Sequence, residues 1–289
     1  MVDISRSTSG VVLPQEVSSE ILAKVQDASI IQSAANQVTL PGPGISFQQI
    51  TGDAVASWVT ETGEKPVSNA TLATKTMTPY KVAVITTFSQ ELTRDKAALY
   101  NTLIDRLPNA LAKKFDETVF HGTAPGSNFD TLESVTEIDF TNVYDAFVDG
   151  VTDIGVAGYE ANGIILSPQA EGSLFAAKDL QERPLFIADL QTEGAIGSAL
   201  GRPIFRSRHV YKAASGGNDA VYGFIGDWTQ AWWGAVEAVN IKISDQASLT
   251  IGEETVSLFQ NNMVAILAEV EVSFLALDEA FRKFTLAGS

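Results

Sequence analysis

The side chains that most enzymes use for catalysis are scarce in this sequence. Its 289 residues include no cysteine and two histidines, His121 and His209. Without cysteine, the chain has no disulfide, thiolate zinc site, iron–sulfur cluster or cysteine nucleophile. The two histidines are far apart in the sequence, and we expect His121 to cap the end of a helix and His209 to lie on the surface. Neither is therefore a candidate general base or metal ligand.

Sequence motifs for nucleotide binding and acyl transfer are also missing. There is no Walker A loop and no Gly-x-Ser-x-Gly elbow, and the glycines between residues 194 and 201 are too widely spaced for a dinucleotide fingerprint. Asp145, Asp149 and Asp153 recur every four residues and would share one helix face, where carboxylates can bind a hard cation. Because no further ligands accompany them, a solvated acidic face is expected. We predict no catalytic, cofactor-binding or metal-binding residue and no enzymatic activity, and a hydrolase that uses carboxylates is the remaining enzymatic alternative.

The net charge is strongly negative, because 19 basic residues stand against 35 acidic ones and give −16. A protein that grips DNA normally shows the opposite sign, since Lys and Arg must neutralise phosphates. The longest apolar runs have about five residues, whereas a membrane helix needs about twenty. The N-terminus lacks the basic and apolar blocks of a signal peptide. We therefore expect no sequence-specific DNA binding, no membrane contact, and synthesis in the cytoplasm.

One short segment departs from this acidic background. Residues 202–212 contain Arg202, Arg206, Arg208 and Lys212 and no acidic residue. Such a basic stretch can contact an acidic patch on a neighbouring copy, or a few phosphates. It can equally be a solvated loop or an edge strand. The sequence leaves both interpretations open, and we keep the three arginines as candidate interface residues.

The segment most informative about function is a polar, threonine-rich stretch over residues 45–80. Its apolar residues alternate with polar ones, which is typical of strands with one apolar face. A long two-stranded arm of this kind is marginal alone in water, and few apolar neighbours in the sequence could cover it. We therefore predict that another subunit covers the arm. Trp58 is the expected anchor, since interface energy concentrates in aromatic residues, and Glu61 and Lys65 are further interface candidates.

The remaining elements predict an α+β fold. A long helix is expected over residues 89–121, where an apolar residue recurs every fourth position from Leu99 to Val119. A shorter amphipathic helix is expected over residues 14–35. From Val264 to Phe274 the even positions are apolar, which predicts a long strand with one buried face. The strands of the arm are expected at 45–59 and 71–88.

From about residue 135 the pattern changes to short strands that alternate with helices. Thr141 is expected to cap one helix, and Ser167, followed by Pro168 at the first helical position, is expected to cap another. We interpret residues 135–250 as a second domain inserted into the first.

The order of these elements resembles that of the major capsid proteins of tailed bacteriophages, which have the Hong Kong 97-type fold. The resemblance covers nearly the whole chain and rests on order and spacing rather than on one specific motif. Trp58-Val59-Thr60-Glu61, followed by Pro66, is similar to the start of the family's E-loop, and Phe115–Gly122 is similar to the end of its spine helix. Further similar segments are Val82–Leu92 at the entry to the spine helix, Gly226–Trp228 with Val239–Ile243 at the end of the axial domain, and Val264–Phe281 in the final peripheral strand.

The resemblance implies a Hong Kong 97-like capsid fold with an N-terminal arm, an extended β-arm (E-loop), a long spine helix, a peripheral domain and an inserted α/β axial domain. It implies a major capsid protein of the virion that assembles into pentamers and hexamers of an icosahedral phage head around double-stranded DNA. Implied partners are copies of itself, a separate scaffolding protein, a portal and a decoration protein. The expected divisions are 1–44 for the N-terminal arm and short helix, 45–80 for the E-loop, 81–134 with 251–289 for the peripheral domain, and 135–250 for the axial domain.

The same resemblance leaves alternatives. An encapsulin-type bacterial compartment has the same fold and encloses a cargo enzyme, but the extended N-terminal stretch and the pronounced arm favour a phage head. Some family members carry a long N-terminal scaffolding segment, and none is recognisable here. The alternatives are a separate scaffold and a processed form, and the initial Met favours the separate scaffold. Some members also cross-link a loop lysine to an asparagine of a neighbour. Lys65 and Lys75 lie in the corresponding arm, but no acidic catalyst is identifiable, so cross-linking is the less favoured interpretation.

Overall fold

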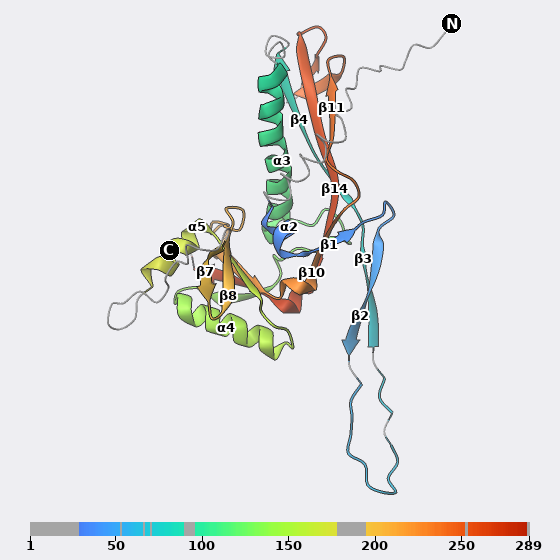
Figure 1. The fold of residues 1–289 in the computed structure, drawn as a ribbon, viewed down its shortest axis with the longest axis vertical. Coiled ribbons are helices and arrows are strands. Elements are labelled where there is room, and N and C mark those ends of the chain that lie inside the picture. The colour runs from blue at the N-terminus through green and yellow to red at the C-terminus, as the bar shows by residue number, and fades with distance from the viewer. Residues whose placement is uncertain are drawn as a thin grey trace.

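The computed structural model describes residues 29–52, 54–65, 67–69, 71–89, 96–177, 195–251 and 254–287. Within these ranges the fold is mixed α+β, with two larger sheets, a projecting two-stranded arm and a long helix (Figure 1). The first 28 residues, and with them most of the helix predicted at 14–35, lie outside the described residues. The end of that prediction is helical, in the short helix α2, Ile30–Ala34. None of the helices in the described ranges combines the length and hydrophobicity that crossing a bilayer requires.

The first sheet is built around one long strand, β14, Met263–Ala276. The even positions from Val264 to Phe274 are buried as predicted, but the expectation of a single buried face is wrong at the C-terminal end. Ser273 and Leu275 are buried too, and Leu275 packs against Leu40 and Met77, where the base of the arm covers the second face. The other members of the sheet are β1 (Asn36–Thr39), β10 (Ala231–Ala235), β11 (Asn240–Ser244) and β4 (Tyr80–Ser89).

The long helix α3, Lys96–His121, lies along the first sheet (Figure 1). Its apolar stripe is buried against β14 and β4, with Leu111, Phe115 and Val119 all almost inaccessible to solvent. The helix ends at His121, and the N–H of the next residue, Gly122, donates to the Thr118 carbonyl oxygen at 3.1 Å. A Cβ at this glycine would lie 2.6 Å from the Thr118 Cα, so the close approach requires glycine. The predicted start at residue 89 is wrong, because Ser89 is the last residue of β4; residues 90–95 lie outside the described ranges.

The second sheet has six strands, and two helices pack against it. The cap predicted for the second helix is confirmed, since the Ser167 Oγ accepts a hydrogen bond from the Ala170 N–H. The cap predicted for the first helix is wrong by one residue: Asn142, not Thr141, accepts the Tyr144 N–H. The order of strands is β5 (Thr136–Asp139), β15 (Phe281–Leu286), β9 (Ala220–Gly226), β6 (Gly163–Leu166), β8 (Arg202–Arg206) and β7 (Ala195–Ala199), and the helices are α4 (Val143–Val156) and α5 (Pro168–Ala176).

Strands on both sides of residue 250, the predicted end of the inserted domain, take part in both sheets. The strands β10 and β11, at 231–244, pair with β14 in the first sheet. The C-terminal strand β15 instead pairs with β5 and β9 in the second sheet. The chain therefore passes between the sheets more than once. The connecting and peripheral elements are the 3-10 turns at Trp228–Gln230 and Asp278–Ala280 and a small hairpin of β12 (Ser248–Ile251) and β13 (Glu254–Ser257).

The arm consists of β2, Ile45–Gly52, and β3, Thr71–Met77, which pair only with each other within the described residues. Both strands are shorter than predicted. The expected continuous strand 71–88 is two strands, because Thr78 and Pro79 interrupt it and β4 then enters the first sheet. The arm is entered through a turn at residues 40–44, in which the Gly44 N–H donates to the Pro41 carbonyl oxygen at 2.8 Å.

Candidate assembly surface

The base of the arm is fixed to the first sheet by polar and aromatic contacts. Lys75 Nζ donates to Asp130 Oδ2 at 2.5 Å and to the Ala276 carbonyl oxygen at 2.6 Å. The same Asp130 oxygen accepts the Ala276 N–H at 3.0 Å. Phe47 on β2 stacks on Trp232 of β10, with ring centroids 5.7 Å apart. The arm therefore leaves the sheet in a defined direction.

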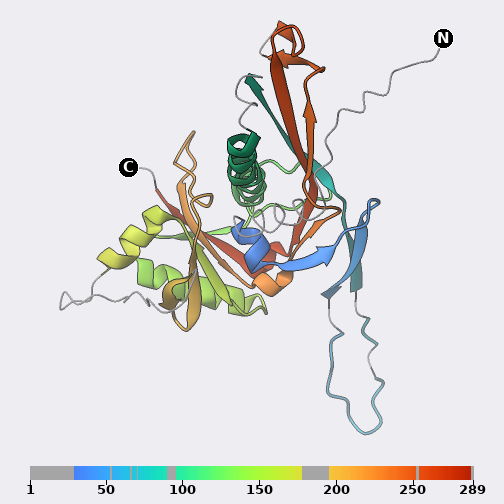
Figure 2. The same ribbon diagram turned by 45° about the horizontal axis from the view of Figure 1, so that its top comes forward.

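Beyond its paired strands the arm continues as an irregular loop, which we call the arm tip, residues 54–69. Both views show it projecting away from the two sheets (Figures 1 and 2). Two hydrogen bonds hold it among its described residues: Val55 N–H donates to Ser68 Oγ at 2.8 Å, and Gly63 N–H donates to the Thr60 carbonyl oxygen at 3.0 Å. The described part of the chain thus leaves the arm tip uncovered.

Apolar side chains of the arm face solvent. Trp58 has a relative exposure of 105%, so the described part of its own chain shields none of it, and Val67 is 89% exposed. Burying about 200 Å² of a tryptophan at about 25 cal/mol per Å² would contribute about 5 kcal/mol. Glu61 and Lys65 are exposed on the same tip, and neither forms an ion pair with another described residue. The three arm candidates from the sequence therefore lie together on one accessible loop.

The basic segment does not form one cationic surface. Arg202 is half-buried, and its guanidinium donates to the carbonyl oxygens of Ala161 at 2.6 Å and Leu200 at 2.8 Å. Arg206 Nη1 lies 3.3 Å from Glu171 Oε2 on α5. Arg208 is exposed, and the described residues give it no ion pair. Arg208 is therefore the member of this segment best placed to meet another molecule.

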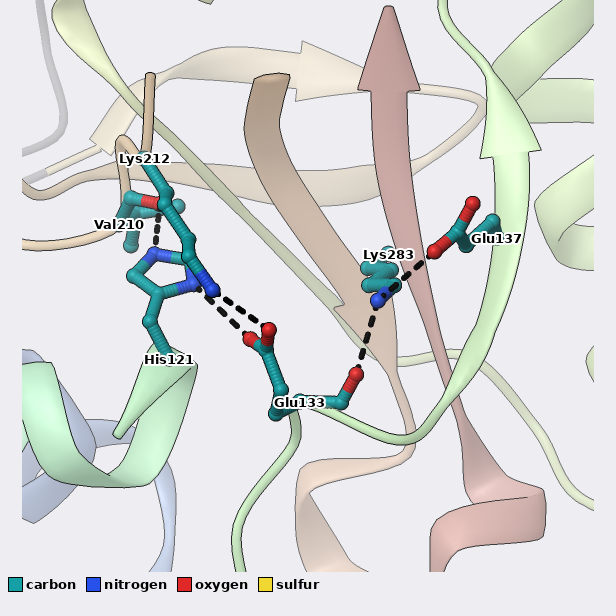
Figure 3. A network of polar contacts seen from close by, with 6 residues as sticks. All are labelled: His121, Glu133, Glu137, Val210, Lys212 and Lys283. Atoms are coloured by element: carbon teal, nitrogen blue, oxygen red, sulfur yellow. Dashed lines mark hydrogen bonds and ion pairs between the residues drawn. The ribbon is translucent and has the colours of Figure 1, made fainter. Parts of the chain in front are cut away.

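The fourth base, Lys212, belongs to a network that sequence reasoning missed (Figure 3). Lys212 Nζ lies 2.6 Å from Glu133 Oε1, and Lys283 Nζ donates to the Glu133 carbonyl oxygen at 2.8 Å and pairs with Glu137 at 2.9 Å. The Lys283 side chain is only 9% exposed. The sequence feature that could have indicated it is the charged pair Arg282-Lys283 between Phe281 and Phe284. The network ties the loop after α3 to the second sheet.

His121 joins this network as the last residue of α3, in agreement with its expected place at the helix end. Its Nε2 forms a hydrogen bond with the Val210 carbonyl oxygen, and its Nδ1 lies 3.6 Å from Glu133 Oε2. Burial lowers the pKa of His121. His209 was expected on the surface but is half-buried, and burial lowers its pKa as well. The two histidines thus serve packing and local hydrogen bonding.

A second buried charge, Asp116, lies on α3 beside the start of α2. Asp116 Oδ1 accepts from Ser29 Oγ at 2.5 Å, and Oδ2 accepts the Ile30 N–H at 3.1 Å. No cation faces it among the described residues, and burial raises the pKa of Asp116 to about 7. The sequence feature that could have indicated this buried charge is a carboxylate between Phe115 and Val119 of the apolar stripe. Asp116 thereby anchors the N-terminal segment on the long helix.

The acidic face predicted on residues 145–153 is exposed on α4. Asp145 accepts a hydrogen bond from Asn142, and Asp153 Oδ2 lies 3.6 Å from Arg282 Nε. In the described ranges, no group of three or more His, Asp or Glu side chains is arranged to hold a metal ion.

The model of the "Phage capsid family" matches residues 9–286. The probable major capsid protein of Mycobacterium phage L5 is 32% identical over 295 aligned positions, covering 94% of this chain and 89% of that protein. A solved chain from Mycobacterium phage Ogopogo has a TM-score of 0.76 at 20% identity, covering 90% of this chain and 92% of that chain. A capsid chain of an empty GTA particle has a TM-score of 0.66 at 16% identity, covering 90% of both chains.

The resemblance to phage capsid proteins read from the sequence is thereby confirmed. The family match spans almost every residue, and the relative from phage L5 is similar over nearly its whole length. This chain belongs to the phage capsid family.

Proposed function

We propose that the chain is the major capsid protein of a phage head and that it assembles into pentamers and hexamers of an icosahedral shell around double-stranded DNA. The observation that carries this proposal is the fully exposed Trp58 on an arm whose base is fixed and whose tip has no cover. An isolated subunit gains nothing from such an arm, whereas a repeating shell covers every copy of it. Because each subunit makes the same contacts many times over, modest interfaces suffice for closure.

Within this proposal the elements take the roles that the resemblance implies. The arm is the E-loop, α3 is the spine helix, the first sheet belongs to the peripheral domain and the second sheet to the axial domain. The strand pairing supports assigning 231–244 to the peripheral domain and β15 to the axial domain. The net charge of −16 favours a wall that does not hold DNA tightly. A scaffolding protein, a portal and a decoration protein remain the proposed partners.

The test replaces Trp58 by Ala in the full chain. We expect the number of closed shells to fall sharply, while the unfolding free energy of the subunit changes by less than about 0.5 kcal/mol, because no described residue of the same chain covers this side chain. Trp58→Phe keeps an aromatic anchor and is expected to assemble better than Trp58→Ala. Shell yield by electron microscopy and subunit unfolding by circular dichroism give the two readouts. Normal shells from Trp58→Ala would refute the anchoring role.

The encapsulin alternative has the same fold, so the contents of the shell separate the two functions. The matched relatives favour a phage head, since the one from phage L5 is named a probable major capsid protein. Purification of shells from cells that also carry the packaging components is expected to yield nuclease-protected DNA. Shells that exclude DNA and retain one enzyme would support the compartment instead.

A further inference from the structure

Asp116 is a fully buried carboxyl at the contact between α3 and the short helix α2, and no opposite charge accompanies it among the described residues. The residue is 0% exposed, and Ala112, Val119 and Phe120 beside it on α3 belong to the main apolar core. The charged group that acts on it is Glu117 of the same helix, which repels a negative charge. Removing an unpaired carboxylate from water is costly, so this environment favours the protonated carboxyl.

The carboxyl of Asp116 holds the start of α2, which lies beside α3 (Figure 1). Its Oδ1 accepts from Ser29 Oγ at 2.5 Å, and its Oδ2 accepts the Ile30 N–H at 3.1 Å. Ser29 is itself buried and caps α2 by accepting the Gln32 N–H at 3.2 Å. Because residues 30–34 include no titratable side chain, α2 brings a hydroxyl and backbone N–H groups to the carboxyl, and no charge.

The rest of α2 is attached to the first sheet independently of Asp116. The Trp233 Nε1–H of β10 donates to the Gln32 carbonyl oxygen at 3.1 Å, and the Ile31 side chain is fully buried in the core. Directly after α2, β1 pairs with β10, which has no titratable side chain either. Asp116 therefore attaches the N-terminal end of α2, and this attachment can open without separating the sheets.

The protonation of Asp116 is coupled to this attachment. Burial raises the pKa of Asp116 to about 7 in the closed contact, although the hydrogen bonds from Ser29 and Ile30 act in the opposite direction. In an opened contact the carboxyl would meet water and return to its ordinary pKa of 3.8. By linkage, the ratio of opened to closed contacts then rises about tenfold per pH unit from about pH 4 to about pH 7, or roughly a thousandfold in total.

We propose that Asp116, Ser29 and Ile30 form a pH-dependent latch: the protonated carboxyl holds the start of α2 on α3, and ionisation of the carboxyl releases Ser29 and Ile30 while both sheets stay folded. The latch lies within one subunit, so the inference goes beyond the proposed function and does not depend on it. The attachment of the N-terminal segment is therefore tight in acid and looser near neutral pH.

Hydrogen exchange read by mass spectrometry tests the latch in the full chain, below the concentration at which it assembles. The amides of residues 29–33 are followed from about pH 4 to about pH 8, and each rate is divided by that of an unstructured peptide of the same sequence. We expect this corrected rate to rise about tenfold per pH unit up to about pH 7 and then to level off. Because the opening is local, we also expect it to exceed the corrected rate of β14 at every pH and to be insensitive to low urea concentrations.

Two variants make the same chemical change at different places. Asp116→Asn cannot ionise, so the corrected rate of residues 29–33 is expected to be independent of pH in this variant. Asp149→Asn, at an exposed position on α4, is the matched control and is expected to keep the full pH dependence. If Asp116→Asn does not fold, the pH series of the native chain, with β14 as internal reference, still decides the question.

Two results would overturn the latch. A corrected rate of residues 29–33 that does not change with pH would show that the closed contact holds no proton. A rate that changes with pH but equals that of β14, with the same sensitivity to urea, would show that Ser29 and Ile30 leave α3 only when the whole subunit unfolds. Neither result bears on shell formation, so the proposed function is tested separately by the Trp58 variants.

Discussion

The buried carboxyl of Asp116 makes subunit stability depend on pH in a predictable direction. Its ordinary pKa is 3.8, and burial raises it to about 7 in the folded chain. Between these values the folded subunit holds a proton that the unfolded chain releases. Stability therefore falls as pH rises from about 4 to about 7 and then levels off. The difference of about three pKa units corresponds to about 4 kcal/mol.

The variant Asp116→Asn removes this dependence with little change of shape. Its amide oxygen can accept the Ile30 N–H, and its amide group can donate to Ser29 Oγ, as a protonated carboxyl would. We expect the variant to gain stability over the native chain by about 1.4 kcal/mol per pH unit from about pH 4 to about pH 7. Asp149→Asn, at an exposed position on α4, is the control and is expected to run parallel to the native chain.

The assay is urea unfolding of the full-length subunit, below its assembly concentration, at a series of pH values. Tryptophan fluorescence reports the transition, and the difference between variant and native chain cancels the titration of all other groups. If the difference between Asp116→Asn and the native chain stays constant across the pH range, the carboxyl is not protonated in the folded subunit and the reasoning is wrong.

Two further substitutions test local features of the fold. Gly44→Ala is expected to destabilise the subunit by about 1–3 kcal/mol, because Gly44 has a φ of +92° and an added Cβ would lie 2.4 Å from the Met77 carbonyl oxygen. Gly42→Ala in the same turn, with nothing within 4 Å, is its control, and equal unfolding midpoints for the two would contradict the strain argument. Lys283→Met is expected to cost about 1–3 kcal/mol in chemical denaturation, because the Glu133 carbonyl oxygen and Glu137 lose a nearly buried partner; an unchanged midpoint would mean that the network in Figure 3 contributes nothing to stability.

Those parts of the fold that depend on local signals could be predicted from the sequence. Ser167-Pro168 marks a helix start because the hydroxyl and the missing N–H act within one turn. The end of the long helix is also marked locally, because the apolar repeat stops at Val119 and Gly122 follows within one turn. Strand partners are a different problem, since nothing local to Phe281–Leu286 says that it joins β9 and β5 rather than β14.

The availability of the candidate site residues could likewise be predicted only where it depends on local sequence. The exposure of Trp58 could be predicted because its neighbours in the sequence cannot cover it. The spacing of Arg202, Arg206 and Arg208 suggested one cationic patch. Two loop carbonyl oxygens hold Arg202, however, and Glu171 pairs with Arg206. Contacts between distant segments decide whether a charged side chain remains available, and a single sequence does not specify those contacts.

The fixed base of the arm determines how much of the free energy of burying Trp58 contributes to assembly. A freely swinging arm would lose conformational entropy when it docks, and that loss would offset much of the gain. Lys75 and Asp130, together with the stack of Phe47 on Trp232, order the base before any neighbour arrives. Only the tip, with its two internal hydrogen bonds among the described residues, is left to adjust. The arm therefore has an ordered base and a tip that can adjust its conformation. This combination suits a contact that must form in both five-fold and six-fold rings of the proposed shell.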